Sequence, residues 1–139
     1  MQATAVIPAV PAIPATAAST RIWYRLALLY FVAGTGLGVY MGVSQDHTMF
    51  PVHAHLNLLG WASLALTGFI YDRFPAATAT RLYPVHFWLY NLALPAAMLA
   101  LVFLFKGNEA FGPVAGIASI VLFASILTFV VNVWRNSDS

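Results

Sequence analysis

Two of the four histidines in the chain lie two residues apart, at the start of a long apolar run. The run reads VHAHLNLLGW over residues 52–61, and its histidines are His53 and His55. An ionisable side chain is costly inside a membrane, and where one occurs it usually serves a function. Because the chain contains no cysteine, imidazole is its main ligand for a borderline metal ion. The pair predicts ligation of heme iron or, as a second candidate, of copper or zinc.

The spacing of the two histidines decides how they could be used. Two residues along an α-helix correspond to a rotation of roughly 200°, so His53 and His55 should point to nearly opposite sides of a helix. A pair that chelates one ion needs a spacing of three or four residues. Either each histidine serves a different site, or one is a ligand and the other is polar structure. In a third interpretation both are interfacial residues that are hydrogen-bonded to loop carbonyls.

The composition gives the class of protein that must position these side chains. Of the 139 residues, 61% are hydrophobic and only 7% are charged, against roughly 25% charged in an average soluble domain. The charged residues leave four uncharged stretches that each reach the ~20 residues a membrane-spanning helix needs. We therefore expect an all-α integral membrane protein, a bundle of four transmembrane helices. Their expected ranges are about 21–43, 52–71, 82–105 and 111–134.

The first 20 residues differ from the rest of the chain. They are rich in proline and alanine, and Pro8, Pro11 and Pro14 follow one another at a spacing of three. That spacing suits polyproline II structure, which has three residues per turn. The expected organisation is an extended N-terminal arm over residues 1–20 and one four-helix transmembrane domain over residues 21–139.

The arginines predict the orientation in the membrane. A cytoplasmic N-terminus puts all five arginines on the inner side and leaves only Lys106 outside, as the positive-inside rule favours. Both termini would then be cytoplasmic, in a multi-pass protein of a bacterial inner membrane. His53 and His55 would lie near the periplasmic face, whereas His86 would lie near the inner face.

The residues that follow the histidine pair form a longer motif. It consists of His53-Ala54-His55, Leu59-Gly60-Trp61, Leu66, Gly68, Tyr71 and Pro75. This order resembles the His-x-His helix of the large subunit of heme–copper oxidases, especially the C-type and nitric oxide reductase branches. That helix also descends from the outer surface. The resemblance covers about residues 45–75.

The resemblance implies roles for the histidines. In that family the first histidine ligates a high-spin heme and the second a low-spin heme, which here would be His53 and His55, with heme b as the cofactor. His55-Leu56-Asn57 is also similar to a His-x-Asn motif of the nitric oxide reductases. The family's subunit has about twelve helices in three arcs, and this chain has enough for one four-helix arc. Because it lacks the histidine pair that holds the active-site copper, oxygen reduction by this chain alone is not expected, and enzymatic activity is left open.

A chain that corresponds to only one four-helix arc suggests that several copies assemble. A homotrimer would rebuild three arcs, and a homodimer is the second choice; either would place heme at subunit interfaces. The expected function is electron transfer or binding of nitric oxide or oxygen, in contact with the lipid bilayer and with a redox protein or a quinol as partner. No nucleic-acid partner is expected. The alternative is a non-redox membrane subunit or a protein that handles copper or zinc.

Further side chains are candidates for supporting roles. Asn57 and Trp61 could hydrogen-bond an imidazole or line a porphyrin, and helix packing explains them equally well. Gly38 belongs to the overlapping GxxxG units at Gly34, Gly38 and Gly42, which allow close approach of a helix or a flat ligand. Lys106 is the only outer cation for heme propionates. The set His86, Tyr90 and Asn91 is interpreted as packing rather than as a quinone or proton site.

Overall fold

All regular secondary structure in the described part of the chain is helical. A computed structural model describes residues 15–137, and no strand occurs among them. The predicted all-α class is therefore confirmed for this range. The elements are α1 (Ala15–Ser44), α2 (Phe50–His55), the π-helix η1 (Leu56–Ala62), α3 (Ser63–Arg73), the 3₁₀-helix η2 (Pro75–Ala79), α4 (Leu82–Phe105), the 3₁₀-helix η3 (Glu109–Phe111) and α5 (Gly112–Arg135).

Three helical stretches of residues 15–137 are long and apolar enough to cross a membrane. They are Thr20–Ser44, Leu82–Phe105 and Glu109–Arg135. Large apolar side chains such as Val32, Ile120 and Trp134 are 69%, 70% and 81% exposed. A surface of this kind suits lipid and not water, so the structure fits a membrane-embedded protein. The stretch expected to be the second span is one unbroken run of α2, η1 and α3.

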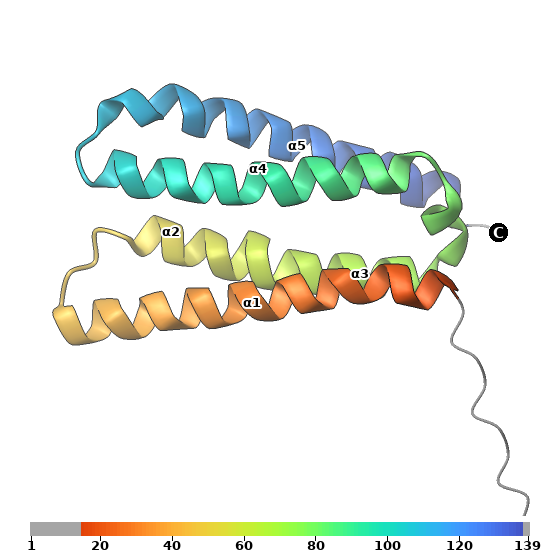
Figure 1. The fold of residues 1–139 in the computed structure, drawn as a ribbon, viewed down its shortest axis with the longest axis horizontal. Helices are drawn as coiled ribbons and strands as arrows, with labels where there is room; N and C mark the ends of the chain where they lie inside the picture. The colour runs from red at the N-terminus through yellow and green to blue at the C-terminus, as the bar shows by residue number, and fades with distance from the viewer. Residues whose placement is uncertain (1–14, 138–139) are drawn as a thin grey trace, which may run out of the picture.

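The helices form two hairpins that lie side by side (Figure 1). In one hairpin α1 packs along η1 and α3, and in the other α4 packs along α5. The start of α1, η2 and the end of α5 lie together at one end of the bundle, which carries all five arginines and which we call the arginine end. The turns after α1 and α4 lie at the opposite end, which we call the Lys106 end.

The helix limits agree with the sequence in the second hairpin and differ in the first. α4 has the expected range 82–105, and α5 begins one residue later than expected. α1 begins at Ala15 instead of at about Arg21, so the extended arm is wrong for residues 15–20. The alanine-rich segment after Pro14 explains the difference, because alanine is the best helix former and proline is tolerated at a helix start. The rest of the arm, residues 1–14, lies outside the described range.

A π-helical segment interrupts the second long helix directly after the histidine pair. The Ser63 hydroxyl donates to the carbonyl of Leu58, five residues back, at 2.8 Å. Tyr90 of α4 donates its hydroxyl to the carbonyl of Leu59 at 2.9 Å. Gly60 is buried in this segment, and a Cβ there would lie 2.6 Å from the ring of Tyr30 on α1. Segments of this kind are rare and are frequent at functional sites.

Aromatic rings at the arginine end bring all four long helices together. Trp23 of α1 stacks on His86 of α4, with ring centroids 4.8 Å apart. Tyr71 of α3 lies edge-on to Phe129 of α5 at 5.3 Å. Trp23, Tyr71 and His86 are at most 1% exposed. Ring packing therefore fixes the hairpins against each other at this end.

Buried hydrogen bonds connect the same region. Asn132 of α5 donates to the carbonyl of Ala77 at 3.0 Å and accepts a hydrogen bond from Thr80 at 2.7 Å. Ser125 of α5 donates to the carbonyl of His86 at 3.0 Å. Because buried polar groups need partners, these bonds tie η2 and α4 to α5. The ring and the backbone carbonyl of His86 thus take part in packing, as expected, whereas Nε2 of the ring takes no part in these bonds.

We expect Asn132→Ala to destabilise the bundle by about 2–4 kcal/mol, because the change removes the buried hydrogen bonds that join Ala77 and Thr80 to α5 and leaves a cavity in place of a fully buried side chain. Asn91→Ala is the matched control, since the Asn91 amide donates only to the carbonyl of Phe87 in its own helix. Thermal unfolding in detergent, followed by far-UV circular dichroism, measures both changes. Equal melting temperatures for the two variants would contradict the role of Asn132.

Candidate functional site

His53 packs against α1. Its Nδ1 lies 2.8 Å from the carbonyl oxygen of Gly34. A Cβ at Gly38 would be 2.7 Å from the imidazole Cε1, so only glycine leaves room for the ring in this position. The GxxxG unit Gly34–Gly38 thus allows close packing of a polar side chain from the next helix.

Asn57 and Trp61 follow His53 on the side that faces α1. The Asn57 amide donates to the carbonyl of His53 at 2.8 Å and fills the space above Gly34. The Trp61 ring lies 4.4 Å from the ring of Phe31 on α1. Asn57 therefore supports His53, whereas Trp61 contributes to helix packing.

His55 points to a different side of the helix. It is exposed, and its Nδ1 lies 2.6 Å from the carbonyl oxygen of Pro51. It lines a groove of about 230 Å³ between the two hairpins. The spacing argument is thus correct: the two imidazoles serve different surfaces. The other lining residues are Leu59, Ala97, Met98, Leu101, Ser119, Leu122, Phe123 and Ile126.

The hydrogen bonds fix which nitrogen of each ring is available. A carbonyl oxygen only accepts, and the Gly34 carbonyl lies closer to His53 Nδ1 than the Asn57 amide, which is 3.4 Å away, so the tautomer with the proton on Nδ1 suits both His53 and His55. In the neutral rings Nε2 then holds the lone pair, and Nε2 has no hydrogen-bond partner within residues 15–137 in either ring. An Nδ1–H bond to a carbonyl is the usual second-shell arrangement of a metal-ligating histidine. Both rings are therefore in a tautomer that leaves Nε2 as a possible ligand atom, and the groove opens beside His55.

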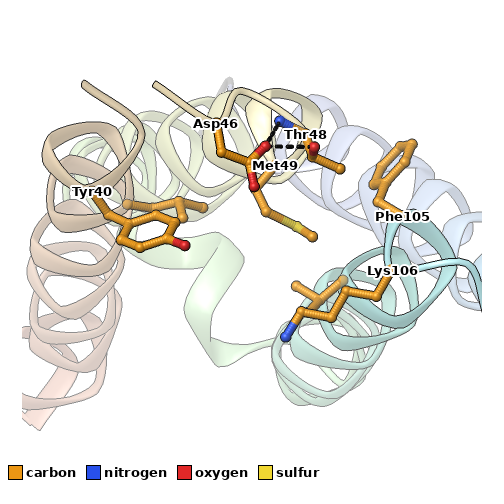
Figure 2. A pocket seen from close by; sticks show the side chains of 8 residues that line it. Tyr40, Asp46, Thr48, Met49, Phe105 and Lys106 are labelled. Atoms are coloured by element: carbon orange, nitrogen blue, oxygen red, sulfur yellow. Dashed lines mark hydrogen bonds between the residues drawn. The ribbon is translucent and has the colours of Figure 1, made fainter. Parts of the chain in front are cut away.

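Lys106 belongs to a separate cavity of about 490 Å³ at the Lys106 end (Figure 2). Asp46 accepts hydrogen bonds from the Thr48 amide and hydroxyl at 2.9 Å and 2.6 Å. These bonds hold the pKa of Asp46 below its usual value. Neither His53 nor His55 lines this cavity, so the structure does not bring Lys106 together with the histidines. The cavity is lined by Leu37, Tyr40, Asp46, Thr48, Met49, Val102, Phe105 and Lys106.

Sequence reasoning missed the groove beside His55. Apart from His55 and Leu59, its lining residues come from α4 and α5. Apolar residues such as Met98 and Phe123 give no signal of a groove in helices that are apolar throughout. The groove exists only because the two hairpins are placed together. No group of three or more histidine, aspartate or glutamate side chains that could hold a metal ion occurs within residues 15–137.

We expect Gly38→Ala to destabilise the first hairpin by about 1–3 kcal/mol, the usual cost of overpacking, because the new methyl group would displace the His53 ring. Gly36→Ala is the matched control: a Cβ there meets nothing within 4 Å, and alanine is favoured over glycine in a helix. Unfolding in a graded detergent mixture measures both. A Gly38→Ala protein as stable as Gly36→Ala would contradict the close contact.

Comparison of the chain with protein-family models, with curated proteins and with solved structures finds no match. The evidence for a function therefore lies in the chemistry of the two histidines and in the surfaces that they face.

Proposed function

We propose that this chain is a membrane protein that binds heme b through His53 and His55. The observation that carries the proposal is the hydrogen bonding of the two imidazoles. Each uses Nδ1 for a backbone carbonyl, at 2.8 Å and 2.6 Å, and keeps Nε2 available. Axial ligation of heme iron requires this lone pair. The chemistry of the two donors thus fits the group.

The groove at His55 also suits one face of a porphyrin. Apart from Ser119 and His55 itself, all its lining residues are apolar. Its volume of about 230 Å³ is below the ~300–1,000 Å³ of sites that enclose a drug-sized ligand, so one chain would cover only part of a porphyrin. A second copy would complete the site. This supports a homo-oligomer, with a trimer as first choice and a dimer as second.

The distribution of charge supports four spans with both termini in the cytoplasm. The arginine end carries all five arginines and the Lys106 end carries none. The positive-inside rule favours the arginine end in the cytoplasm of a bacterial cell. In this proposal α2, η1 and α3 together cross the membrane as the remaining span, and the histidines lie near the periplasmic face.

The two modes of ligation give two activities. A heme with two histidine ligands carries electrons, whereas a heme with one open axial position binds a diatomic gas such as nitric oxide or oxygen. The chain's own residues orient the ligands: Gly34 accepts from His53, Pro51 accepts from His55, and Asn57 supports the backbone at His53. We favour electron transfer or gas binding over catalysis.

We expect the purified protein to have a Soret band and sharp α and β bands after reduction. His55→Ala and His53→Ala should each lower the heme content at least about tenfold, because each removes an axial bond that no nearby side chain replaces. His47→Ala is the control, since His47 is an exposed turn residue whose Nδ1 also lies near a carbonyl, that of Gln45 at 3.2 Å. Absorption spectra and pyridine hemochrome assays measure the content.

Two results would decide against the proposal. A colourless protein after expression with sufficient heme would exclude heme binding, and equal losses in His47→Ala and His55→Ala would exclude a specific role for His55. Carbon monoxide added to the reduced protein separates the two activities. A shifted Soret band indicates an open axial position, and an unchanged one indicates two histidine ligands.

Heme shared between subunits makes the assembly depend on His55. We expect three chains per particle by light scattering in detergent, and dissociation toward monomers in His55→Ala, because ligand binding stabilises an assembly by mass action. A monomer that contains heme would contradict a heme site shared between subunits. It would show that the residues of one chain are sufficient to bind heme.

A further inference from the structure

A second groove lies between α3 and α5, nearer to the arginine end than His55. Its volume is about 230 Å³. Its polar residues are Ser63, Thr67, His86 and Tyr90. The remaining walls are apolar and come from Leu66, Ile70, Ile126 and Phe129.

Two of the polar side chains in this groove are deeply buried and have an unused hydrogen-bonding atom. His86 is 1% exposed and Thr67 is 5% exposed. His86 uses Nδ1 for the Tyr71 hydroxyl at 2.9 Å, and no other hydrogen bond is formed by His86 Nε2 or Thr67 Oγ1 within residues 15–137. In contrast, Thr128 bonds back to the carbonyl of Ala124 in its own helix.

The unused atoms are not sealed inside the protein. Within residues 15–137, no fully enclosed side-chain nitrogen or oxygen lacks a partner. His86 Nε2 and Thr67 Oγ1 must therefore retain some accessible surface, and the groove that both residues line provides it. Two nearly buried polar groups thus meet the same opening.

The hydrogen-bond network favours the tautomer in which His86 offers a donor at Nε2. Asn132 Oδ1 accepts from Thr80 at 2.7 Å, and Asn132 Nδ2 donates to the carbonyl of Ala77 at 3.0 Å, which fixes the orientation of the amide. Nδ2 also donates to the Tyr71 hydroxyl at 3.5 Å. The Tyr71 proton is then directed to His86 Nδ1, so the proton of the neutral ring is on Nε2.

We propose that this groove binds the head group of a lipid-soluble 1,4-quinone. The His86 N–H and the Thr67 hydroxyl are donors in an apolar groove, and donors left without an acceptor there are costly. A quinone carbonyl accepts from both, and its flat ring suits the wall formed by Phe129 and Ile126. The small volume accommodates one head group, and the open side lets the tail remain in lipid. The site does not depend on heme binding.

Trp23 provides a reporter for this site, because its ring stacks on His86 with centroids 4.8 Å apart. The substitutions Trp61→Phe, Trp88→Phe and Trp134→Phe remove the exposed tryptophans and leave Trp23 alone. This reporter protein is placed in phosphatidylcholine nanodiscs and titrated with 2-methyl-1,4-naphthoquinone. We expect saturable quenching of the Trp23 fluorescence.

Thr67→Val tests the donor while keeping the shape of the side chain. We expect the quinone affinity to fall about fivefold, the factor for one ordinary hydrogen bond. Thr128→Val is the matched control and should leave the affinity unchanged. Circular dichroism confirms that both variants are folded. Quenching that does not saturate, or equal affinities for Thr67→Val and Thr128→Val, would overturn the proposal.

The ester carbonyl of a phospholipid is a hydrogen-bond acceptor like the carbonyl of a quinone. A change in the lipid of the bilayer distinguishes these two occupants. The titration is repeated in nanodiscs of ether-linked phosphatidylcholine, which has no ester carbonyl. The same affinity in both bilayers supports the quinone as occupant. Saturable binding only in the ether-linked bilayer would show that phospholipid carbonyls hold the groove, and would overturn the quinone assignment.

Discussion

The hydrogen bond between Tyr71 and His86 is the contact on which the arrangement of the bundle depends. It joins the first hairpin to the second at 2.9 Å, inside a cluster of rings that includes Trp23 and Phe129. In lipid, hydrophobic burial does not drive helices together, so packing and hydrogen bonds must do so. The hairpins are held by this cluster at the arginine end. Toward the Lys106 end they separate around a cavity of about 490 Å³.

This asymmetry separates structural from chemical roles among the polar side chains. At the arginine end Asn132 and Ser125 are buried and bonded, and they connect elements that are distant in the sequence. Nearer the Lys106 end, Nδ1 of His53 lies near a carbonyl of α1 and the Asn57 amide, Nδ1 of His55 lies near a carbonyl of its own helix, and each ring keeps Nε2 free. A membrane protein that retains such partly used imidazoles has a reason beyond stability, which is why the proposed function rests on them.

The sequence was sufficient for features that depend on local chain properties. The uncharged stretches predicted the range of α4, and the helical period predicted the opposed directions of His53 and His55. The sequence was not sufficient where the environment of a side chain depends on residues of another helix. The central position of His86 depends on Tyr71 and Trp23, and a single histidine in an apolar helix does not indicate which rings will surround it. The unused hydroxyl of Thr67 is invisible for the same reason.

The π-helical segment links the packing of the bundle to the chemistry of the histidines. One extra residue in a turn rotates the part of the helix before it by about 100° relative to the part after it. η1 lies between His55 and α3, so it sets which side of the bundle His55 faces. Its geometry is held from two directions, by Tyr90 at the carbonyl of Leu59 and by Tyr30 against Gly60. Without η1, the His-Ala-His sequence on the same helix would face other surfaces. The orientation of the two histidines therefore depends on the contacts of η1 with α1 and α4 as much as on the motif itself.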